Sequence, residues 1–178
     1  IFSSDNGPAG YPPGKIAGSS GRLKGRKTHI FQGGVNVPFF VRWPGQVDAG
    51  KTDSQSLLSA VDLLPTFCDL VGKELPEDYQ PAGESFASIF KNIPFQRTKP
   101  LFWEWRFATD NPNRPNSWVY LAVRDGDWKL LANRDRSRIE LYNIAEDRIE
   151  MQDLSEDNPG KVNKLLALWD EWKATLPE

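Results

Sequence analysis

Short alternating runs of apolar and polar residues in the last part of the chain are typical of β-strands. They cover residues 101–105, 118–132 and 138–144. The middle run is divided by Asp125-Gly126, a dipeptide that favours a two-residue hairpin turn and therefore predicts a strand on each side of it. The pattern predicts an antiparallel sheet in this part of the chain.

An amphipathic helix is predicted after these strands. Asn158 and Pro159 suit the start of a helix, because asparagine caps the first turn and proline fits the first helical position. An antiparallel sheet crossed by one helix can bury a core of its own, so residues 98–178 are expected to form a small α+β subdomain. The apolar face of the predicted helix consists of Val162, Leu165, Leu166, Trp169 and Trp172.

The first part of the chain is expected to contain longer loops. Residues 1–2 resemble the end of a buried strand, which runs into a turn at Asp5-Asn6-Gly7. Residues 7–34 are rich in glycine, proline, serine and lysine, and they predict a long loop with little regular structure. Apolar residues at alternate positions then predict a strand over residues 37–43.

A further helix is predicted around Pro65, and this proline sets where the helix begins. With Ser59 as N-cap, Pro65 would remove a hydrogen bond inside the helix. With Asp62 as N-cap it falls at the third helical position, where the N–H has no helical partner. We therefore expect a regular helix from about Asp62, closed by Gly72. Its apolar stripe consists of Ala60, Val61, Leu64, Phe67, Cys68 and Val71.

Composition and charge exclude several classes of function. The 178 residues are 39% hydrophobic and 26% charged, as is usual for a globular protein. A formal net charge of -2 gives no electrostatic reason to bind nucleic acid or an anionic membrane. No apolar run approaches the roughly 18 residues that indicate a membrane-spanning helix. We expect neither nucleic acid nor a membrane as a partner.

The chain contains one cysteine, Cys68, and one histidine, His29. These two residues allow no internal disulfide and no zinc site built from thiolates and imidazoles. A reactive Cys68–His29 pair is one interpretation of them. The apolar stripe around Cys68 favours the other interpretation, a buried structural thiol.

Two stretches near the start of the chain carry candidate chemistry. Asp5 and Asn6 offer oxygen ligands at the end of a strand, where open α/β sheets place their sites, and such oxygens suit calcium or magnesium. An ordinary turn is the alternative. Lys24, Arg26 and Lys27 form a basic cluster in a glycine-rich loop, which is either a solvated surface or a cradle for a tetrahedral oxyanion.

A second group of polar and aromatic residues lies in the first predicted strand of the sheet. Trp103, Glu104 and Arg106 are candidates to line a pocket for a polar, ring-shaped substrate. Aromatic residues in strands are otherwise part of a core. His29 is a further candidate for a substrate contact.

The order of these motifs resembles the C-terminal part of a type I sulfatase (arylsulfatase family, alkaline phosphatase superfamily). The resemblance implies that Asp5 and Asn6 ligate calcium, with magnesium less suitable, and that Lys27 contacts the sulfate. Lys24 and Arg26 fall on no matching position. The stretches that carry the resemblance are FSSDNG, LKGRK, FQGGVNVPFFVRWPG, AVDLLPTFCDLVG, LFWE, AVRDGDWKLL and ELYNIAED.

The chain departs from the pattern of the family at two positions in this region. It has Gln32 where the family usually has Glu, and Asn36 where the family often has Arg. Family members also make their nucleophile, a formylglycine, in a Cys-x-Pro-x-Arg type motif. Cys68 is followed by Asp-Leu-Val-Gly-Lys and does not match this motif. We expect the nucleophile to lie upstream.

The resemblance implies an α/β sulfatase fold, with residues 1–97 as the end of the large catalytic domain and residues 98–178 as the small subdomain. The implied function is hydrolysis of sulfate esters on a small molecule or a carbohydrate, in a periplasmic or secreted enzyme. The missing N-terminal half of the same protein is the expected partner, and the chain alone is expected to be inactive. Two alternatives stay open: a related phosphodiesterase or phosphonate monoester hydrolase, and a non-catalytic binding module.

Overall fold

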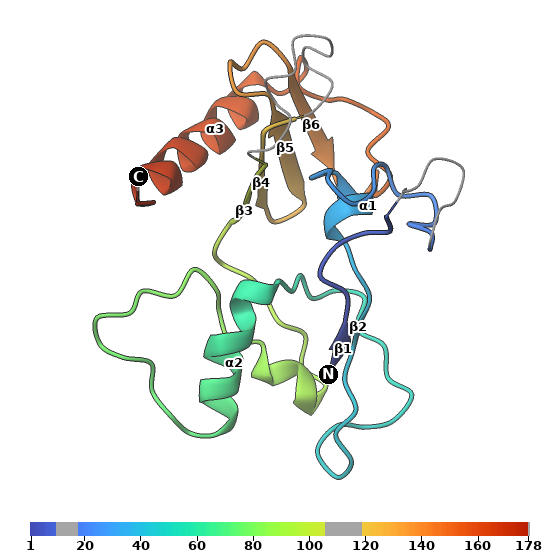
Figure 1. Ribbon diagram of the computed structural model, residues 1–178, viewed down its shortest axis with the longest axis vertical. Helices are drawn as coiled ribbons and strands as arrows, with labels where there is room; N and C mark the ends of the chain where they lie inside the picture. The colour runs from blue at the N-terminus through green and yellow to red at the C-terminus, as the bar shows by residue number, and fades with distance from the viewer. Residues whose placement is uncertain (10–17, 106–118, 178) are drawn as a thin grey trace. The chain divides into compact units, whose positions relative to one another are not determined.

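The computed structural model describes residues 1–9, 18–105 and 119–177 (Figure 1). Contacts divide the chain into two compact units. The first unit comprises Ile1 and Phe40–Pro100, and the second comprises Phe2–Phe39 and Leu101–Glu178. The predicted domain boundary after residue 97 concerns the intact protein and stays a prediction.

The second unit contains a four-stranded antiparallel sheet in the order β3-β4-β5-β6. The strands lie where the alternating pattern predicts them. The hairpin turn between β4 and β5 differs by one residue from the prediction: Asp125 pairs with Trp128, so Gly126 and Asp127 form the turn. Gly126 adopts a φ of 58°, which such a turn requires. The strands are β3 (Leu101–Glu104), β4 (Leu121–Asp125), β5 (Trp128–Ala132) and β6 (Ile139–Asn143).

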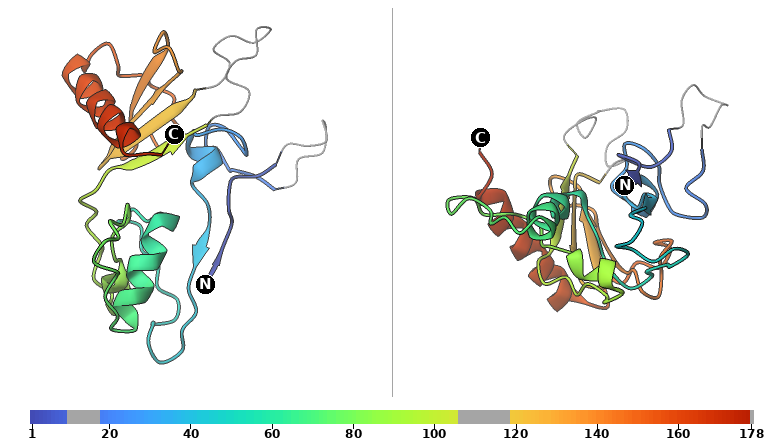
Figure 2. Two further views of the ribbon diagram at one scale, coloured as in Figure 1. Left: turned by 60° about the vertical axis from the view of Figure 1, so that its left-hand side comes forward. Right: turned by 90° about the horizontal axis from the view of Figure 1, so that it is seen from below.

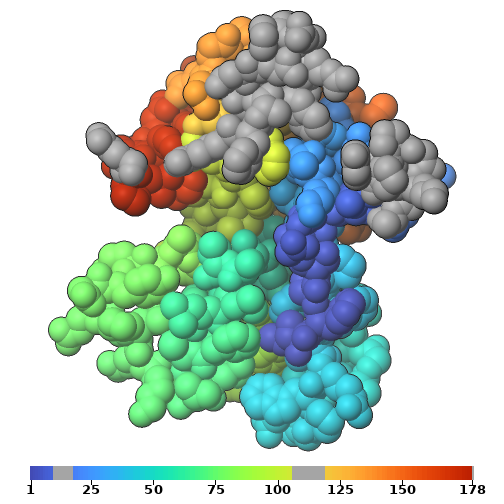
Figure 3. Space-filling model, in the orientation of Figure 1, coloured from blue at the N-terminus to red at the C-terminus, as the bar shows by residue number. Residues whose placement is uncertain are grey.

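Helix α3 (Pro159–Ala174) covers one face of this sheet (Figure 2). Its predicted start at Asn158 and Pro159 and its predicted apolar face are confirmed. Trp172 stacks on Phe102 of β3 with ring centroids 4.9 Å apart. Figure 3 shows α3 in red against the yellow strands. The fully buried members of this core are Leu121, Val123, Leu130, Ala132, Leu141, Val162, Leu165 and Trp169.

Residues 24–35 cover the opposite face of the sheet. Ile30 and Phe31 pack against the strand residues that alternate with those facing α3, among them Leu131 and Tyr142. The chain then forms α1 (Gln32–Val35), a single helical turn within a stretch predicted to be loop. The right-hand view of Figure 2 shows the strands between red α3 and this blue segment. We call residues 24–35 the covering segment.

The N-terminal stretch pairs with the residues that follow the covering segment. Strand β1 (Phe2–Ser3) lies beside β2 (Phe39–Phe40) in a two-stranded sheet. The hydroxyl of Ser3 donates to the carbonyl of Pro38 at 2.9 Å and adds a side-chain link. The strand predicted over residues 37–43 is therefore present but shorter.

The first unit contains a 3-10 turn η1 (Ala60–Asp62), helix α2 (Leu63–Leu70) and a second 3-10 helix η2 (Ala87–Lys91). Ser59 begins η1 through a capping box with Asp62, and α2 begins directly after Asp62. The prediction of a regular helix from about Asp62 is confirmed, although the side chain of Asp62 makes no cap hydrogen bond to α2. None of the helices in the described ranges is long and apolar enough to span a membrane.

The α2 region buries two polar residues and exposes much of its predicted apolar stripe, which is the reverse of the usual arrangement. Asp62 and Thr66 are completely buried, whereas Val61, Leu64 and Phe67 are exposed. Asp62 accepts the backbone N–H groups of Ser59 and Glu84 at 2.7 and 2.9 Å and pairs with Arg97. These polar bonds orient the helix, because a buried carboxylate must have partners.

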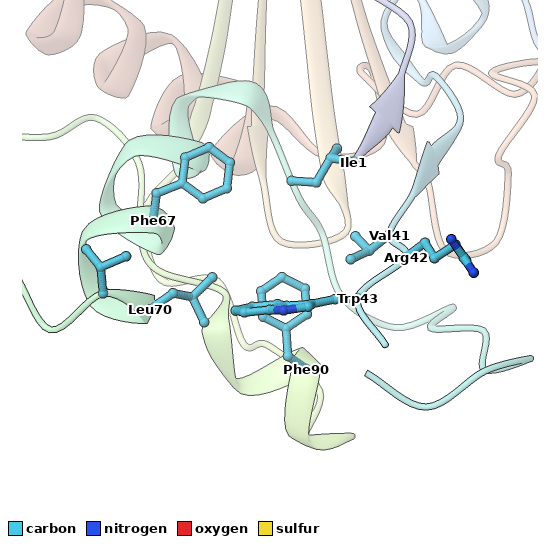
Figure 4. A pocket seen from close by; sticks show the side chains of 8 residues that line it. Ile1, Val41, Arg42, Trp43, Phe67, Leu70 and Phe90 are labelled. Carbon is cyan, nitrogen blue, oxygen red and sulfur yellow. The ribbon is translucent and has the colours of Figure 1, made fainter. Parts of the chain in front are cut away.

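An apolar pocket of about 340 Å³ lies within the first unit (Figure 4). The ring of Trp43 meets that of Phe90 edge to face, with centroids 6.1 Å apart. Arg42 supplies the only charged side chain of the lining, and its guanidinium points away from these two rings. The pocket offers apolar surface and no group suited to acid–base chemistry. Its lining consists of Ile1, Val41, Arg42, Trp43, Phe67, Leu70, Val71 and Phe90.

Candidate functional site

Asp5 and Asn6 are held in place by the glycine that follows them. The N–H of Gly7 donates to the carbonyl of Gly34 at 2.8 Å. A Cβ atom on Gly7 would lie 1.9 Å from the carbonyl oxygen of Gly33, a distance at which two backbones cannot remain. Only glycine therefore permits this approach between the Asp-Asn turn and α1.

The basic loop joins the same place through its own backbone. The N–H of Gly33 donates to the carbonyl of Lys24 at 2.7 Å, and the N–H of Lys27 donates to the carbonyl of Pro8 at 3.1 Å. Three stretches of chain thus meet through main-chain bonds. We call residues 5–8, 24–29 and 32–34 the junction. The junction brings the backbone of the predicted metal ligands next to the backbone that carries Lys27.

Lys27 occupies an exposed position in a tight turn over residues 26–29. The N–H of His29 donates to the carbonyl of Arg26 at 2.9 Å, and the N–H of Arg26 donates to Nδ1 of His29 at 3.1 Å. Thr28 adopts a φ of 77°, which is uncommon for a β-branched residue and costs on the order of 1–3 kcal/mol. Two hydrogen bonds therefore hold a strained turn that presents Lys27.

His29 acts in the structure as part of this turn. Burial lowers the pKa of His29 below its ordinary value of about 6.5, and the nearby Arg26 charge lowers it further. A neutral ring with its proton on Nε2 leaves Nδ1 able to accept the Arg26 N–H. The predicted substrate contact by His29 stays a prediction.

Asp5 is exposed and Asn6 is partly buried. Their carboxylate and amide oxygens are ligands of the type that calcium takes, so the two residues fit this ion in kind. Two side chains are fewer than the six to eight oxygens that calcium requires. Within the described ranges no group of three or more His, Cys, Asp or Glu residues is placed to hold a metal ion.

Lys24 has a different environment from Lys27, although both belong to the same basic loop. Its ammonium donates to the hydroxyl of Tyr142 at 2.9 Å, lies 3.5 Å from a carboxylate oxygen of Glu140 and sits 4.2 Å from the centre of the Phe31 ring. Lys24 therefore fastens the covering segment to β6. The alternating positions of β6 are the signal that could have identified this role, because Glu140 and Tyr142 point to the same face.

Two of the predicted pocket residues, Trp103 and Glu104, lie on opposite faces of the sheet. Trp103 packs on the face that the covering segment occupies, with its ring 5.9 Å from Nζ of Lys129. Glu104 points to the other face, where it accepts from Lys173 at 2.8 Å and from the hydroxyl of Tyr120. Neighbouring residues of a strand face opposite sides, so Trp103 and Glu104 do not line one pocket. Arg106 lies outside the described residues.

A buried ion pair that the sequence analysis did not identify lies beneath the junction. Nζ of Lys129 in β5 donates to Oε1 of Glu150 at 2.8 Å, and neither side chain is exposed. Burial lowers the pKa of Lys129 to about 8, although the Glu150 carboxylate acts against this shift. The other oxygen of Glu150 accepts the N–H of Gln32 at 2.7 Å.

Comparison with known proteins identifies the family. Residues 25–171 match the family model described as "N-sulphoglucosamine sulphohydrolase, C-terminal". The chain belongs to this family, and it corresponds to the C-terminal part of a sulfatase. The matched range includes most of the covering segment, the sheet and nearly all of α3.

Individual relatives agree with this assignment. Human arylsulfatase A is 41% identical over 76 residues, which are 43% of this chain and 14% of that protein. The crystal structure of Ps i-CgsB, also solved in complex with k-i-k-neocarrahexaose, gives a TM-score of 0.73 at 28% identity and covers 96% of this chain and 35% of that one.

The same fold also occurs in an enzyme named for a different activity. The phosphonate monoester hydrolase of Agrobacterium radiobacter gives a TM-score of 0.61 at 22% identity, with 96% of this chain and 34% of that chain covered. This likeness concerns the fold alone. The chain spans only part of its relatives: two curated sulfatases that it matches are covered over 22% and 18% of their length.

The junction predicts a strong effect of a single methyl group at Gly7. Gly7→Ala places a carbon atom against the Gly33 carbonyl, so we expect a loss of about 1–3 kcal/mol in the free energy of unfolding. Gly160→Ala is the matched control, since a Cβ atom there meets no neighbour. Denaturant unfolding measures both variants. Equal stability of the two would show that the backbones of residues 7 and 33 are not in close contact.

The half-buried ring of His29 predicts a low pKa and a pH-dependent stability. NMR titration of the single histidine should give a pKa below about 6.5. Because the unfolded chain then binds more protons than the folded chain, stability is complete above about pH 6.5 and falls as the pH decreases toward the folded pKa. Arg26→Gln should raise this pKa part of the way back. A wild-type pKa at or above the ordinary value contradicts the arrangement.

Proposed function

We propose that the protein containing this chain is a sulfatase that hydrolyses sulfate esters, and that the junction forms one wall of its active site. The observation that carries the proposal is the backbone hydrogen bond from Lys27 to Pro8, the residue that directly follows the Asp5-Asn6-Gly7 turn. Membership in the sulfatase family supports the same reaction class. A metal-binding turn and a cationic turn at one place suit an anionic ester.

Lys27 is proposed to donate to a sulfate oxygen. An ammonium group is a compact cation with three donors, and it suits a tetrahedral oxyanion. Such a donor contributes most when it is fixed before the reaction begins. The two Arg26–His29 hydrogen bonds support this role, because they fix the backbone of the turn. Lys24 takes no part in the proposal, since its ammonium is already bound to Tyr142.

Asp5 and Asn6 are proposed to ligate one calcium ion. Calcium accepts carboxylate and amide oxygens in flexible geometry, whereas magnesium prefers a strict octahedron and keeps several waters. When bound, a divalent cation stabilises negative charge on an oxyanion. Because these two residues supply fewer ligands than calcium needs, the remaining ligands are proposed to come from outside the 178 residues.

The nucleophile is also proposed to lie outside this chain, as a formylglycine. Cys68 lies in α2, and the residues after it lack the proline and arginine of the formylglycine motif. The exposed apolar stripe of α2 and the limited share of the relatives' length that the chain spans support a larger intact protein. The chain by itself is therefore proposed to be inactive.

The substrate is proposed to be a sulfated carbohydrate. Ps i-CgsB was solved with k-i-k-neocarrahexaose, and another relative bears the name N-acetylgalactosamine-6-O-sulfatase. Both names refer to sugars. Trp103 stays a candidate for a sugar contact, because its side chain is only partly buried beside the covering segment.

Separate substitutions of Lys27 and Lys24 distinguish a catalytic lysine from a structural one. In the full-length protein, Lys27→Ala should lower kcat for a chromogenic aryl sulfate by roughly 10²–10³-fold, as for the loss of one fixed donor. Lys24→Met keeps the apolar stem on Phe31 and should change kcat much less. An aryl phosphonate ester serves as the second substrate. Equal losses of kcat in both variants would contradict the proposal. So would a wild-type enzyme that hydrolyses the phosphonate ester faster than the sulfate ester.

The proposed division of the metal site predicts weak calcium binding by the 178-residue chain. Two ligands are too few for a tight site, so titration calorimetry should give a dissociation constant weaker than about 1 μM. Asp5→Ala should remove the remaining signal. The same sample should not hydrolyse an aryl sulfate. A calcium dissociation constant at or below about 1 μM would show that the chain holds a complete metal site. Hydrolysis that disappears in Cys68→Ala would show that it holds a complete catalytic site.

A further inference from the structure

Glu150 connects two parts of the second unit through the two oxygens of one carboxylate. Oε1 accepts from Nζ of Lys129 at 2.8 Å, and Oε2 accepts from the backbone N–H of Gln32 at 2.7 Å. Nζ of Lys129 also lies 3.3 Å from Oε1 of Gln32. The three residues are almost inaccessible to water, with Gln32 4% exposed and the other two 0%. We call them the buried triad.

The triad has no evident purpose as a source of stability alone. Removing two charges from water costs several kcal/mol, and well-packed apolar side chains often replace a buried ion pair with no loss of stability. What apolar side chains cannot supply is an acceptor for the Gln32 N–H. This N–H belongs to the first turn of α1, so it has no partner within the helix.

The hydrogen bond from Gln32 to Glu150 affects the junction because of where Gln32 lies in the chain. Gln32 directly precedes Gly33 and Gly34, the two residues against which the Gly7 backbone lies. Contacts this close allow no independent movement, so a shift of α1 also moves the turn that carries Asp5 and Asn6. The N–H of Gly33 also donates to the backbone carbonyl of Lys24 and thereby links the triad to the basic loop.

The backbone at Glu150 is a second, independent observation. Glu150 adopts a φ of 58°, in the left-handed region that glycine or asparagine normally occupies. Glycine would adopt this backbone conformation more easily, but it has no carboxylate to accept hydrogen bonds from Gln32 and Lys129. Backbone strain of this kind persists where the surrounding structure requires one side chain, and it gathers at functional sites.

We propose that Lys129 and Glu150 are positioning residues for the reaction: through Gln32 they fix α1, and through α1 they fix the junction. The inference rests on the proposed function for its kinetic consequence and on the geometry alone for its structural consequence. Lys129 holds the charge of Glu150 in place, and Glu150 holds the Gln32 N–H. The C-terminal sheet therefore determines where the candidate catalytic groups lie.

A double substitution distinguishes positioning from simple support of the fold. Lys129→Met and Glu150→Leu together replace the ion pair with apolar side chains, whereas Lys129→Met alone leaves a buried unpaired carboxylate. If the pair only supported the fold, the double variant would recover both stability and site geometry. If the pair positions the junction, the double variant recovers stability and the site stays displaced.

The structural readout is hydrogen exchange in the full-length protein, followed by mass spectrometry of peptides covering residues 4–9 and 31–36. We expect both peptides to exchange at least 10-fold faster in the double variant than in the wild type. Glu150→Gln keeps an acceptor oxygen and should exchange at an intermediate rate. The control is Arg136→Met with Asp170→Leu, which removes an exposed ion pair of the same unit and should change neither peptide.

The kinetic readout is kcat and KM for an aryl sulfate, expressed per folded molecule. We expect the double variant to lose roughly 10- to 100-fold in kcat with little change in KM, as for catalytic groups displaced by about 1 Å. Wild-type exchange in a folded double variant overturns the inference. Inactivity of the wild-type protein overturns the proposed function instead, and the exchange measurement still decides the inference. If the double variant does not fold, Glu150→Leu replaces it. Hydrogen exchange at the wild-type rate in that variant overturns the inference.

Discussion

Every strand of the four-stranded sheet carries apolar side chains on both faces, and this requirement for two covers governs the second unit. Helix α3 covers one face, and its residues lie directly after the strands in the chain. The covering segment lies on the other face, although it ends at residue 35 and the first strand of the sheet begins only at residue 101. A segment that carries candidate catalytic groups is thus also a layer of the core.

Glycine makes the junction possible, because three backbones approach more closely than any side chain would allow. Gly7 contacts Gly33, and a Cβ atom on Gly33 would in turn lie 2.3 Å from the carbonyl oxygen of Gly25. Close main-chain contacts hold their partners more rigidly than flexible side chains do. The junction can therefore place Lys27 at an exposed turn and still define its backbone.

The regular elements could be predicted from the sequence because their patterns are local. Period-two alternation identified the strands, and the helical spacing from Val162 to Trp172 identified α3 with its correct face. The pattern of α2 gave its limits but not its buried side, since Asp62 finds its partners Glu84 and Arg97 far along the chain. Local patterns contain no information on such partners.

The candidate site was predictable only in part for the same reason. The resemblance to a known family selected Asp5, Asn6 and Lys27, and in the structure the N–H of Lys27 donates to the carbonyl of Pro8, which follows the Asp5-Asn6-Gly7 turn. Nothing in the local pattern distinguishes Lys24 from Lys27 or marks Lys129 for burial, because a lysine in a strand is usually exposed. Lys129 and Glu150 are 21 residues apart with strand β6 between them, and only the folded chain brings the two together.

The long separation in sequence between the covering segment and its sheet has a consequence for how the protein is made. The bonds from Gln32 to Glu150 and from Lys24 to Tyr142 each close a loop of 118 residues. Contacts with such high contact order form late, after the local hairpins and α3. On the ribosome the candidate site must wait until β6 and Glu150 have emerged. A chain that stops before Glu150 would contain Asp5, Asn6 and Lys27. It would lack the carboxylate that binds Gln32 and fixes the position of α1 beneath them.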